Sequence, residues 1–264
     1  MITKASIETL AGRLRSAFTA GPVPPLRDLL QASDVTGAFA VQSFNVSLWK
    51  QEGRRISGRK IGLTSRAVQA QLGVEQPDYG VLFKDMAIES GGVLEASRVL
   101  QPKVEAEIAI TLRRDLDNPE ADIQDVIAAT EYVLPAIEIV DSRIADWKIS
   151  IADTVADNAS SAFYVLGNEP RSIAGLDLWT CGMVLEINGV VSSLGAGAAC
   201  LGHPLQSAAW LARTLSSLKD PLRAGDVILT GALGPMAPIH PNTIISATIG
   251  GVGTCGFKYE GAGV

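Results

Sequence analysis

The sequence is poor in histidine and cysteine. Its 264 residues include only two histidines, His203 and His240, so chemistry that needs several histidines is nearly excluded. His203 precedes a proline at the start of a predicted helix, where we expect it to pack or to cap the helix. The three cysteines are far apart and form no Cys-x-x-Cys pair, which indicates neither a zinc knuckle nor a disulfide framework. We therefore expect the cysteines to be packing residues.

The chain also lacks clusters of positive charge and long apolar runs. It has 22 Lys and Arg against 28 Asp and Glu, and its net charge is −6. Without a basic cluster to neutralise phosphates, we do not expect nucleic acid as a partner. No segment approaches the roughly 20 apolar residues that a membrane span needs. Residues 1–19 carry charges where a signal peptide would be apolar, so we expect a cytoplasmic protein with no membrane partner.

Apolar residues are abundant but lie in short runs. Hydrophobic residues make up 47% of the chain and charged residues 19%. This balance is typical of a compact, well-buried protein and favours a homo-oligomer.

The spacing of apolar residues changes near residue 55. Before it, apolar side chains recur at helical spacing, with a Gly- and Pro-rich break at residues 20–25. Ser33 or Asp34 is a suitable cap for the second helix. Beyond it, short apolar runs separated by Gly, Pro and Asp predict mainly strands. We therefore expect an α+β protein with a helical N-terminal segment, residues 1–55, and a β-rich mixed-sheet body, residues 56–264.

The same patterns predict individual elements in the second region. Asn188-Gly189 separates two extended runs and is a strong hairpin signal, because both central residues of a type I′ turn need positive φ. The expected elements are strands at residues 102–112, 132–140, 226–230, 243–249 and 254–259, a hairpin at residues 184–193, and helices at residues 123–130 and 203–218.

Three glutamates lie inside apolar runs that predict strands. Glu105 and Glu107 point to the same face, roughly 6.6 Å apart along the backbone, and Glu138 lies in a second run that could pair with the first. A solvated strand face would also explain the first two, but Ile137 and Ile139 leave no polar face for Glu138. Buried carboxylates need neutralisation, and an all-oxygen set suits Mg²⁺ or Mn²⁺ better than Zn²⁺.

Other polar residues have more than one interpretation when taken alone. Lys60, in a glycine-flanked apolar strand, is either buried and paired, lining a cavity, or an ordinary edge-strand lysine. Asp78 lies in a turn signal and is expected to cap its own backbone. Residues 153–161 form a polar loop suited to hydrogen-bonding a carboxylate. The glycine-rich residues 195–198 and 230–235 lack a nucleotide-binding motif and are expected to be places of close backbone approach.

These segments together resemble the 2-hydroxypenta-2,4-dienoate hydratases (2-keto-4-pentenoate hydratases) of the fumarylacetoacetate hydrolase superfamily. The resemblance runs from about residue 38 to residue 257, and the combination of segments is more specific than any one of them. Its distinctive stretches are Lys60-Ile61-Gly62-Leu63-Thr64-Ser65, residues 71–80, Val104-Glu105-Ala106-Glu107, residues 137–143, residues 154–160, Leu201-Gly202-His203-Pro204 and residues 229–235.

The resemblance implies a metal site and a reaction. By it, Glu105, Glu107 and Glu138 match the ligands of a divalent cation, Mg²⁺ or Mn²⁺. The implied reaction is the metal-dependent hydration of 2-hydroxypenta-2,4-dienoate to 4-hydroxy-2-oxopentanoate in the meta-cleavage degradation of aromatic compounds. The enzyme would be a hydro-lyase, and its partner a small 2-hydroxydienoate. Association with neighbouring pathway enzymes would also fit.

The resemblance also implies residues that face the substrate. Lys60 and Asp78 match catalytic polar groups, with Lys60 neutralising charge and Asp78 moving protons. Ser160 lies in the loop expected to hold the substrate carboxylate, and Leu82 is expected to contact the substrate.

Other members of the superfamily offer alternatives. The 4-oxalocrotonate (2-oxo-3-hexenedioate) decarboxylases share the Glu-x-Glu strand but usually carry an apolar residue where Asp78 lies. The hydrolases need a histidine in an early loop, whereas His203 and His240 follow the metal strands. A non-catalytic structural subunit would be expected to have lost the ligand residues, and here they are present.

Overall fold

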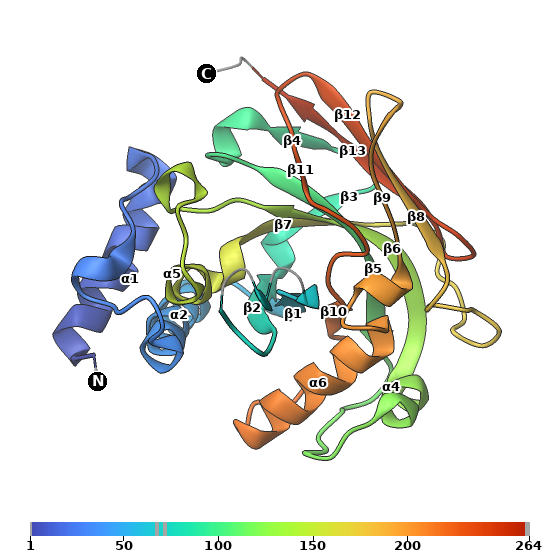
Figure 1. Cartoon of the computed structure of the whole chain (residues 1–264), viewed down its shortest axis with the longest axis horizontal. Coiled ribbons are helices and arrows are strands. Elements are labelled where there is room, and N and C mark those ends of the chain that lie inside the picture. The colour runs from blue at the N-terminus through green and yellow to red at the C-terminus, as the bar shows by residue number, and fades with distance from the viewer. Residues whose placement is uncertain (1, 67–68, 71–72, 262–264) are drawn as a thin grey trace.

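The computed structural model describes residues 2–66, 69–70 and 73–261. The N-terminal helices lie at one side of the molecule, and two sheets form the rest together with α4 and α6 (Figure 1). The helices are α1 Lys4–Ala20, α2 Val35–Gln51, α4 Ile123–Ala129, α5 Ile151–Ala156 and α6 Pro204–Ser217, with short 3₁₀ turns at Leu26–Asp28, Lys84–Met86, Ala96–Arg98, Ala145–Trp147, Asn158–Ser160 and Gly197–Ala199.

The strands belong to an eight-stranded and a five-stranded sheet. The first has the order β2-β1-β10-β5-β6-β7-β3, with β11 also paired to β5, and the second has the order β4-β13-β12-β8-β9. Their bounds are β1 Ile56–Gly62, β2 Asp78–Phe83, β3 Ala87–Glu89, β4 Val93–Glu95, β5 Lys103–Leu112, β6 Thr130–Val140, β7 Ser161–Leu166, β8 Gly182–Ile187, β9 Val190–Ala196, β10 Val227–Leu229, β11 Ala237–Pro238, β12 Thr243–Ile249 and β13 Gly253–Glu260.

The second N-terminal helix begins where the sequence predicts. The Asp34 side chain accepts a hydrogen bond from the Gly37 N–H and so caps α2. Apolar side chains of α1 and α2, including Leu10 and Val41, pack with Ile151 and Val155 of α5 in a core separate from that of the sheets. The helical segment is therefore packed against the second region through α5, and the division at residue 56 stays a prediction.

The predicted strand and helix pattern of the second region is confirmed, including the hairpin. Asn188 and Gly189 have φ values of 53° and 73°, as a type I′ turn requires. The glycine-rich segments are places of close backbone approach, since a Cβ at Gly195 would overlap the Leu233 carbonyl. Cys181, Cys200 and Cys255 are buried and free. No described helix combines the length and apolar character that a membrane crossing requires.

The prediction of a loop at residues 153–161 is wrong. Its first part belongs to α5, and its second part is a turn in which Asn158, Ala159 and Ser160 have φ values of 55°, 53° and 53°. A capping box explains the helix, because the Ser150 side chain accepts from the Asp153 N–H while the Asp153 carboxylate accepts from the Ser150 N–H.

Candidate active site

The pairing of β5 with β6 brings the three glutamates together. Glu105 lies directly opposite Glu138, and Glu107 is two residues further along β5 on the same face. One carboxylate oxygen from each residue lies within 4.8 Å of the others. The site is therefore an all-oxygen cluster where the first half of β5 pairs with the end of β6, and these are the two longest strands of the larger sheet (Figure 1).

The glutamate oxygens fit a hard cation. Glu107 and Glu138 have no exposed surface, and Glu105 is partly buried. The Gly231 N–H donates to Oε2 of Glu107 at 2.7 Å. Among the described residues, Oε1 of Glu107 and Oε1 of Glu138 find no hydrogen-bond partner, and Oε2 of Glu138 meets only the Lys60 ammonium. Buried acceptors left in this way are costly, and a bound Mg²⁺ or Mn²⁺ would satisfy them.

Lys60 supplies the positive charge of the cluster. It lies in β1, between β2 and β10, so the edge-strand interpretation is wrong. Its Nζ forms an ion pair with Oε2 of Glu138 at 3.0 Å. Burial alone would lower the pKa of Lys60, but the negative charges of Glu138 and Asp78, followed by those of Glu105 and Glu107, raise it above its ordinary value. The ammonium group is therefore charged near neutral pH.

Asp78 lies beside this cluster and not in an exposed turn. It is the first residue of β2, is 3% exposed, and pairs across the sheet with Gly62 of β1. A Cβ at Gly62 would overlap Oδ1 of Asp78, so the glycine leaves room for the carboxylate. Burial raises the pKa of Asp78 to about 6, against the opposing effect of Lys60. Such a group can both accept and donate a proton near neutral pH.

The acidic groups hold their protons more tightly than isolated carboxylates do. Burial, followed by the negative charge of Glu138, raises the pKa of Glu105 to about 7. Burial also raises the pKa of Glu107 and of Glu138. Four carboxylates around one lysine would carry a net charge of −3 when fully ionised. A divalent cation would reduce this charge to −1, which is a second reason why the residues fit one.

Ser160 is presented by the left-handed turn that follows α5. Three consecutive non-glycine residues with positive φ are unfavourable, so contacts elsewhere must hold them. The Asn158 side chain accepts from the Val81 N–H at 2.8 Å and donates to the Val81 carbonyl at 2.9 Å. The Ser160 hydroxyl lies 3.3 Å from that of Thr154, and both side chains are buried.

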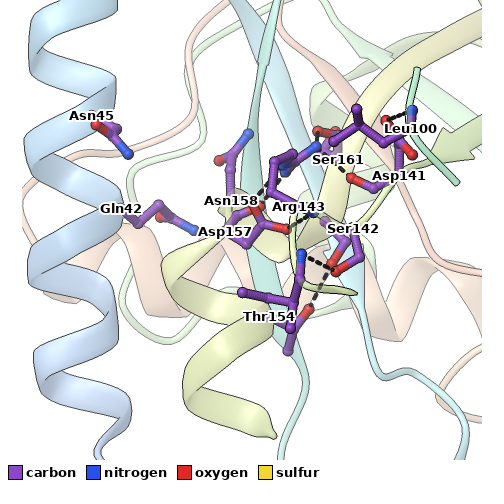
Figure 2. Close-up of polar contacts among 12 residues, drawn as sticks. Gln42, Asn45, Leu100, Asp141, Ser142, Arg143, Thr154, Asp157, Asn158 and Ser161 are labelled. Carbon is purple, nitrogen blue, oxygen red and sulfur yellow. Dashed lines mark hydrogen bonds and ion pairs between the residues drawn. The ribbon is translucent and has the colours of Figure 1, made fainter. Parts of the chain in front are cut away.

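A buried arginine anchors the same turn. Arg143 donates to the Asp157 carboxylate at 2.5 Å, to the Asp157 carbonyl at 2.5 Å, and to the carbonyls of Asp141 and Ser161 at 2.6 and 3.0 Å (Figure 2). These bonds join the end of β6 to the start of β7 across the turn. The sequence analysis gave Arg143 no role. An arginine that directly follows a long apolar strand, with aspartates on both sides of the turn, could have indicated a buried ion pair.

Three other residues considered in the sequence analysis lie outside the acidic cluster. Leu82 is fully buried, four residues beyond Asp78 on the same face of β2, and its contact with substrate stays a prediction. Nδ1 of His203 accepts from the Leu205 N–H and caps α6, as expected. His240 is exposed.

Comparison with known proteins gives the family. The family model for the C-terminal part of fumarylacetoacetate (FAA) hydrolase matches residues 58–258. A 2-keto-4-pentenoate hydratase of Burkholderia vietnamiensis is 52% identical over 250 residues, which cover 94% of this chain and 95% of the relative. A 2-hydroxyhexa-2,4-dienoate hydratase of Comamonas testosteroni is 42% identical, and the alignment covers 98% of this chain and 99% of the relative.

A solved structure shares the whole fold. The 4-oxalocrotonate decarboxylase from Pseudomonas putida G7, complexed with magnesium and adipate, superposes with a TM-score of 0.92 and is 36% identical. The match covers 98% of this chain and 99% of that one. The chain therefore belongs to the fumarylacetoacetate hydrolase family, in the branch of its 2-keto-4-pentenoate hydratases.

Proposed function

We propose that this protein is a hydro-lyase that hydrates 2-hydroxypenta-2,4-dienoate to 4-hydroxy-2-oxopentanoate in the meta-cleavage degradation of aromatic compounds. The observation that carries the proposal is one buried cluster that joins three glutamates to a lysine and to a further carboxylate, Asp78. Two 2-keto-4-pentenoate hydratases support the same reaction, because each has 52% sequence identity to this protein over nearly the whole chain.

We infer that Glu105, Glu107 and Glu138 hold Mg²⁺ or Mn²⁺. The unpartnered oxygens and the all-carboxylate donor set support this assignment, as does the magnesium complex of the related decarboxylase. When bound, the ion supplies electrostatic stabilisation of negative charge on the substrate. Both ions prefer oxygen ligands, so the donor set favours either of them over Zn²⁺.

The protein's own residues position the substrate and move protons. The Ser160 hydroxyl donates to the substrate carboxylate, with the Thr154 hydroxyl beside it. The Lys60 ammonium offsets the negative charge that develops when the 2-hydroxyl proton leaves. The 2-hydroxyl proton passes to Asp78, which delivers it to C5 and gives a 2-oxo-3-enoate. Asp78 then takes a proton from the water that attacks C4 and returns it to C3, which completes the addition of one water molecule.

The direct test follows the ultraviolet absorbance of freshly generated 2-hydroxypenta-2,4-dienoate. We expect loss of the dienol with added Mn²⁺ or Mg²⁺ and not with excess EDTA, together with a product that has gained one water by mass. Absence of turnover under all of these conditions would rule out the proposed reaction.

A decarboxylase is the second candidate because the protein superposes closely on one. Its substrate would be 2-oxo-3-hexenedioate, and its signature would be release of CO₂. Asp78, a carboxylate beside the cluster, favours proton transfer and hydration instead. A structural subunit is disfavoured because the acidic cluster and its lysine are complete. Release of CO₂ from 2-oxo-3-hexenedioate without hydration of the dienol would identify the protein as a decarboxylase.

Metal removal is expected to lower stability. Because binding restores partners to buried carboxylates only in the folded state, Mn²⁺ at about 100 times its dissociation constant should stabilise the fold by about 2.7 kcal/mol. For a chain of this size we expect the unfolding temperature to rise by about 5 to 10 °C over the EDTA-treated protein, measured by calorimetry. Identical unfolding temperatures with Mn²⁺ and with EDTA would contradict the proposed site.

We also propose that the protein is a homo-oligomer that uses the free edge of β9. Val190, Val191 and Leu194 are 68%, 53% and 62% exposed on this edge strand. The strand carries no charge and no proline to block pairing, and it can meet a second copy of itself antiparallel without charge repulsion. Association with neighbouring pathway enzymes stays a prediction.

Val191→Lys is therefore expected to reduce the particle mass measured by light scattering. A two-fold pairing of β9 strands would bring the new ammonium groups of the two copies near each other, which opposes association. Ile127→Lys is the matched control, because Ile127 is a 42% exposed apolar residue on α4. Equal masses for Val191→Lys and the unmodified protein would exclude this interface.

A further inference from the structure

One peptide unit links helix α6 to the acidic cluster. The Thr230 carbonyl accepts hydrogen bonds from the Ser207 hydroxyl at 2.6 Å and from the Cys200 thiol at 2.8 Å. The N–H of the same peptide belongs to Gly231 and donates to Oε2 of Glu107 at 2.7 Å. Ser207 lies on α6 and Cys200 lies shortly before it. Residues outside the larger sheet therefore reach a proposed metal ligand through a single peptide.

The direction of this peptide is fixed by its geometry. In a trans peptide the carbonyl and the N–H point in opposite directions, so the two side-chain donors lie on the side away from Glu107. The Thr230 N–H and hydroxyl both donate to the Ile108 carbonyl, at 3.1 and 2.9 Å, which ties the peptide to β5 beside Glu107. Gly231 has a φ of 110°, and a Cβ there would overlap the Thr64 side chain. Glycine is therefore required where the N–H approaches the carboxylate.

The two side-chain donors are buried and keep their protons. Ser207 and Cys200 have no exposed surface. Burial raises the pKa of the Cys200 thiol to about 12, so the thiol remains a donor near neutral pH. Among the described residues, no backbone N–H donates to the Thr230 carbonyl. The hydroxyl and the thiol are therefore what satisfies this buried acceptor.

We propose that Ser207 and Cys200 are positioning residues for Glu107, because they hold the Thr230–Gly231 peptide so that its N–H fixes Oε2 of Glu107 and leaves Oε1 for the cation. Oε1 has no hydrogen-bond partner among the described residues. Successive hydrogen bonds polarise one another, by roughly 10–30% per bond, so donors to the carbonyl also make the Gly231 N–H a stronger donor. The inference rests on the metal site of the proposed function.

Ser207→Ala is expected to weaken Mn²⁺ binding about three- to tenfold, measured by calorimetric titration. Loss of a direct partner of a metal ligand costs about 10- to 100-fold, and this loss should be smaller because the Cys200 thiol still holds the carbonyl. The double variant Ser207→Ala/Cys200→Ala removes both donors and should lose at least about tenfold. Circular dichroism checks the fold of each variant.

A conservative replacement separates the hydrogen bond from general packing. Cys200→Ser keeps a donor at this position, and a hydroxyl suits the 2.8 Å distance to the carbonyl. Ser207→Ala/Cys200→Ser should therefore bind Mn²⁺ within about twofold of Ser207→Ala alone. This variant also tests the relay if the double alanine variant does not fold.

The chain offers a matched control for each residue. Ser216 is a second buried serine on α6, and its hydroxyl donates to the Asp117 carboxylate at 2.6 Å. Cys255 is a second buried and free cysteine, on β13. Ser216→Ala and Cys255→Ala should keep the Mn²⁺ affinity of the unmodified protein, whatever stability they lose.

The Gly231 amide proton gives a readout that needs no metal. A short hydrogen bond to a carboxylate moves an amide proton resonance downfield. In EDTA-treated protein we expect the Gly231 resonance, measured by heteronuclear NMR, to move upfield in Ser207→Ala and in Cys200→Ala. It should stay in place in Ser216→Ala.

Three results would overturn the inference. They are an unchanged Mn²⁺ affinity in both Ser207→Ala and the double alanine variant, an equal loss of affinity in Ser216→Ala, and a Gly231 resonance that does not move. A graded loss of Mn²⁺ affinity with a shifted Gly231 resonance, in a protein that hydrates no dienol, would uphold the positioning role and refute the proposed reaction.

Discussion

Asp78→Asn is expected to lower turnover of 2-hydroxypenta-2,4-dienoate by about 10²- to 10⁴-fold, the usual contribution of a positioned acid or base. Asparagine has the same shape but cannot exchange a proton near neutral pH. Because Asp78 lies outside the three-glutamate cluster, Mn²⁺ affinity should change by no more than a few fold. Steady-state kinetics gives the first quantity, and calorimetric titration with Mn²⁺ gives the second.

Asp115→Asn is a suitable control for this experiment. Asp115 is an exposed aspartate that pairs with Arg223 at the surface, and its loss should leave turnover unchanged. Near-normal hydration by Asp78→Asn would show that the proton reaches C5 by another route. A large loss of Mn²⁺ affinity would instead make Asp78 part of the metal site.

Glu107→Gln is expected to weaken Mn²⁺ binding by more than about 100-fold and to remove detectable hydration. Loss of an outer partner of a metal ligand already costs about 10- to 100-fold in affinity, so loss of a direct charged ligand should cost more. The amide oxygen can still accept from the Gly231 N–H, so the fold should persist. Calorimetric titration with Mn²⁺ measures the effect, and circular dichroism checks the fold.

Glu169→Gln provides the matched control, since Glu169 is an exposed glutamate paired with Arg171 at the surface. Its Mn²⁺ affinity and turnover should equal those of the unmodified protein. Unchanged Mn²⁺ affinity in a folded Glu107→Gln variant would remove Glu107 from the set of ligands.

The metal cluster was predictable in part because strand periodicity is local. Two residues apart on a strand means the same face, so Glu105 and Glu107 could be placed together from the sequence. The register that puts Glu138 opposite Glu105 could not, because α4 and its connections separate the two strands. That register follows from packing of both sheet faces, which no short segment specifies.

Asp78 and α5 show why local signals fail. The residues around Asp78 favour a turn, but pairing with Gly62 extends the chain and buries the carboxylate. At α5, small polar residues suggested a loop, although the Ser150 and Asp153 capping box was legible in the sequence. The anchoring by Arg143 depends on partners up to 18 residues away and brought close only by the fold.

The core shared by α1, α2 and α5 has a consequence for how the enzyme opens and closes. Because Ile151 and Val155 of α5 have their apolar partners in the first two helices, these elements should unfold as one cooperative unit. Amide hydrogens of α2 and α5 should then exchange with a common opening free energy, lower than that of β5 and β6. Each such opening also removes the Thr154 hydroxyl of α5 from beside that of Ser160, which would interrupt catalysis. The turn itself, held by Arg143 and Asn158, and the acidic cluster would stay on the sheet.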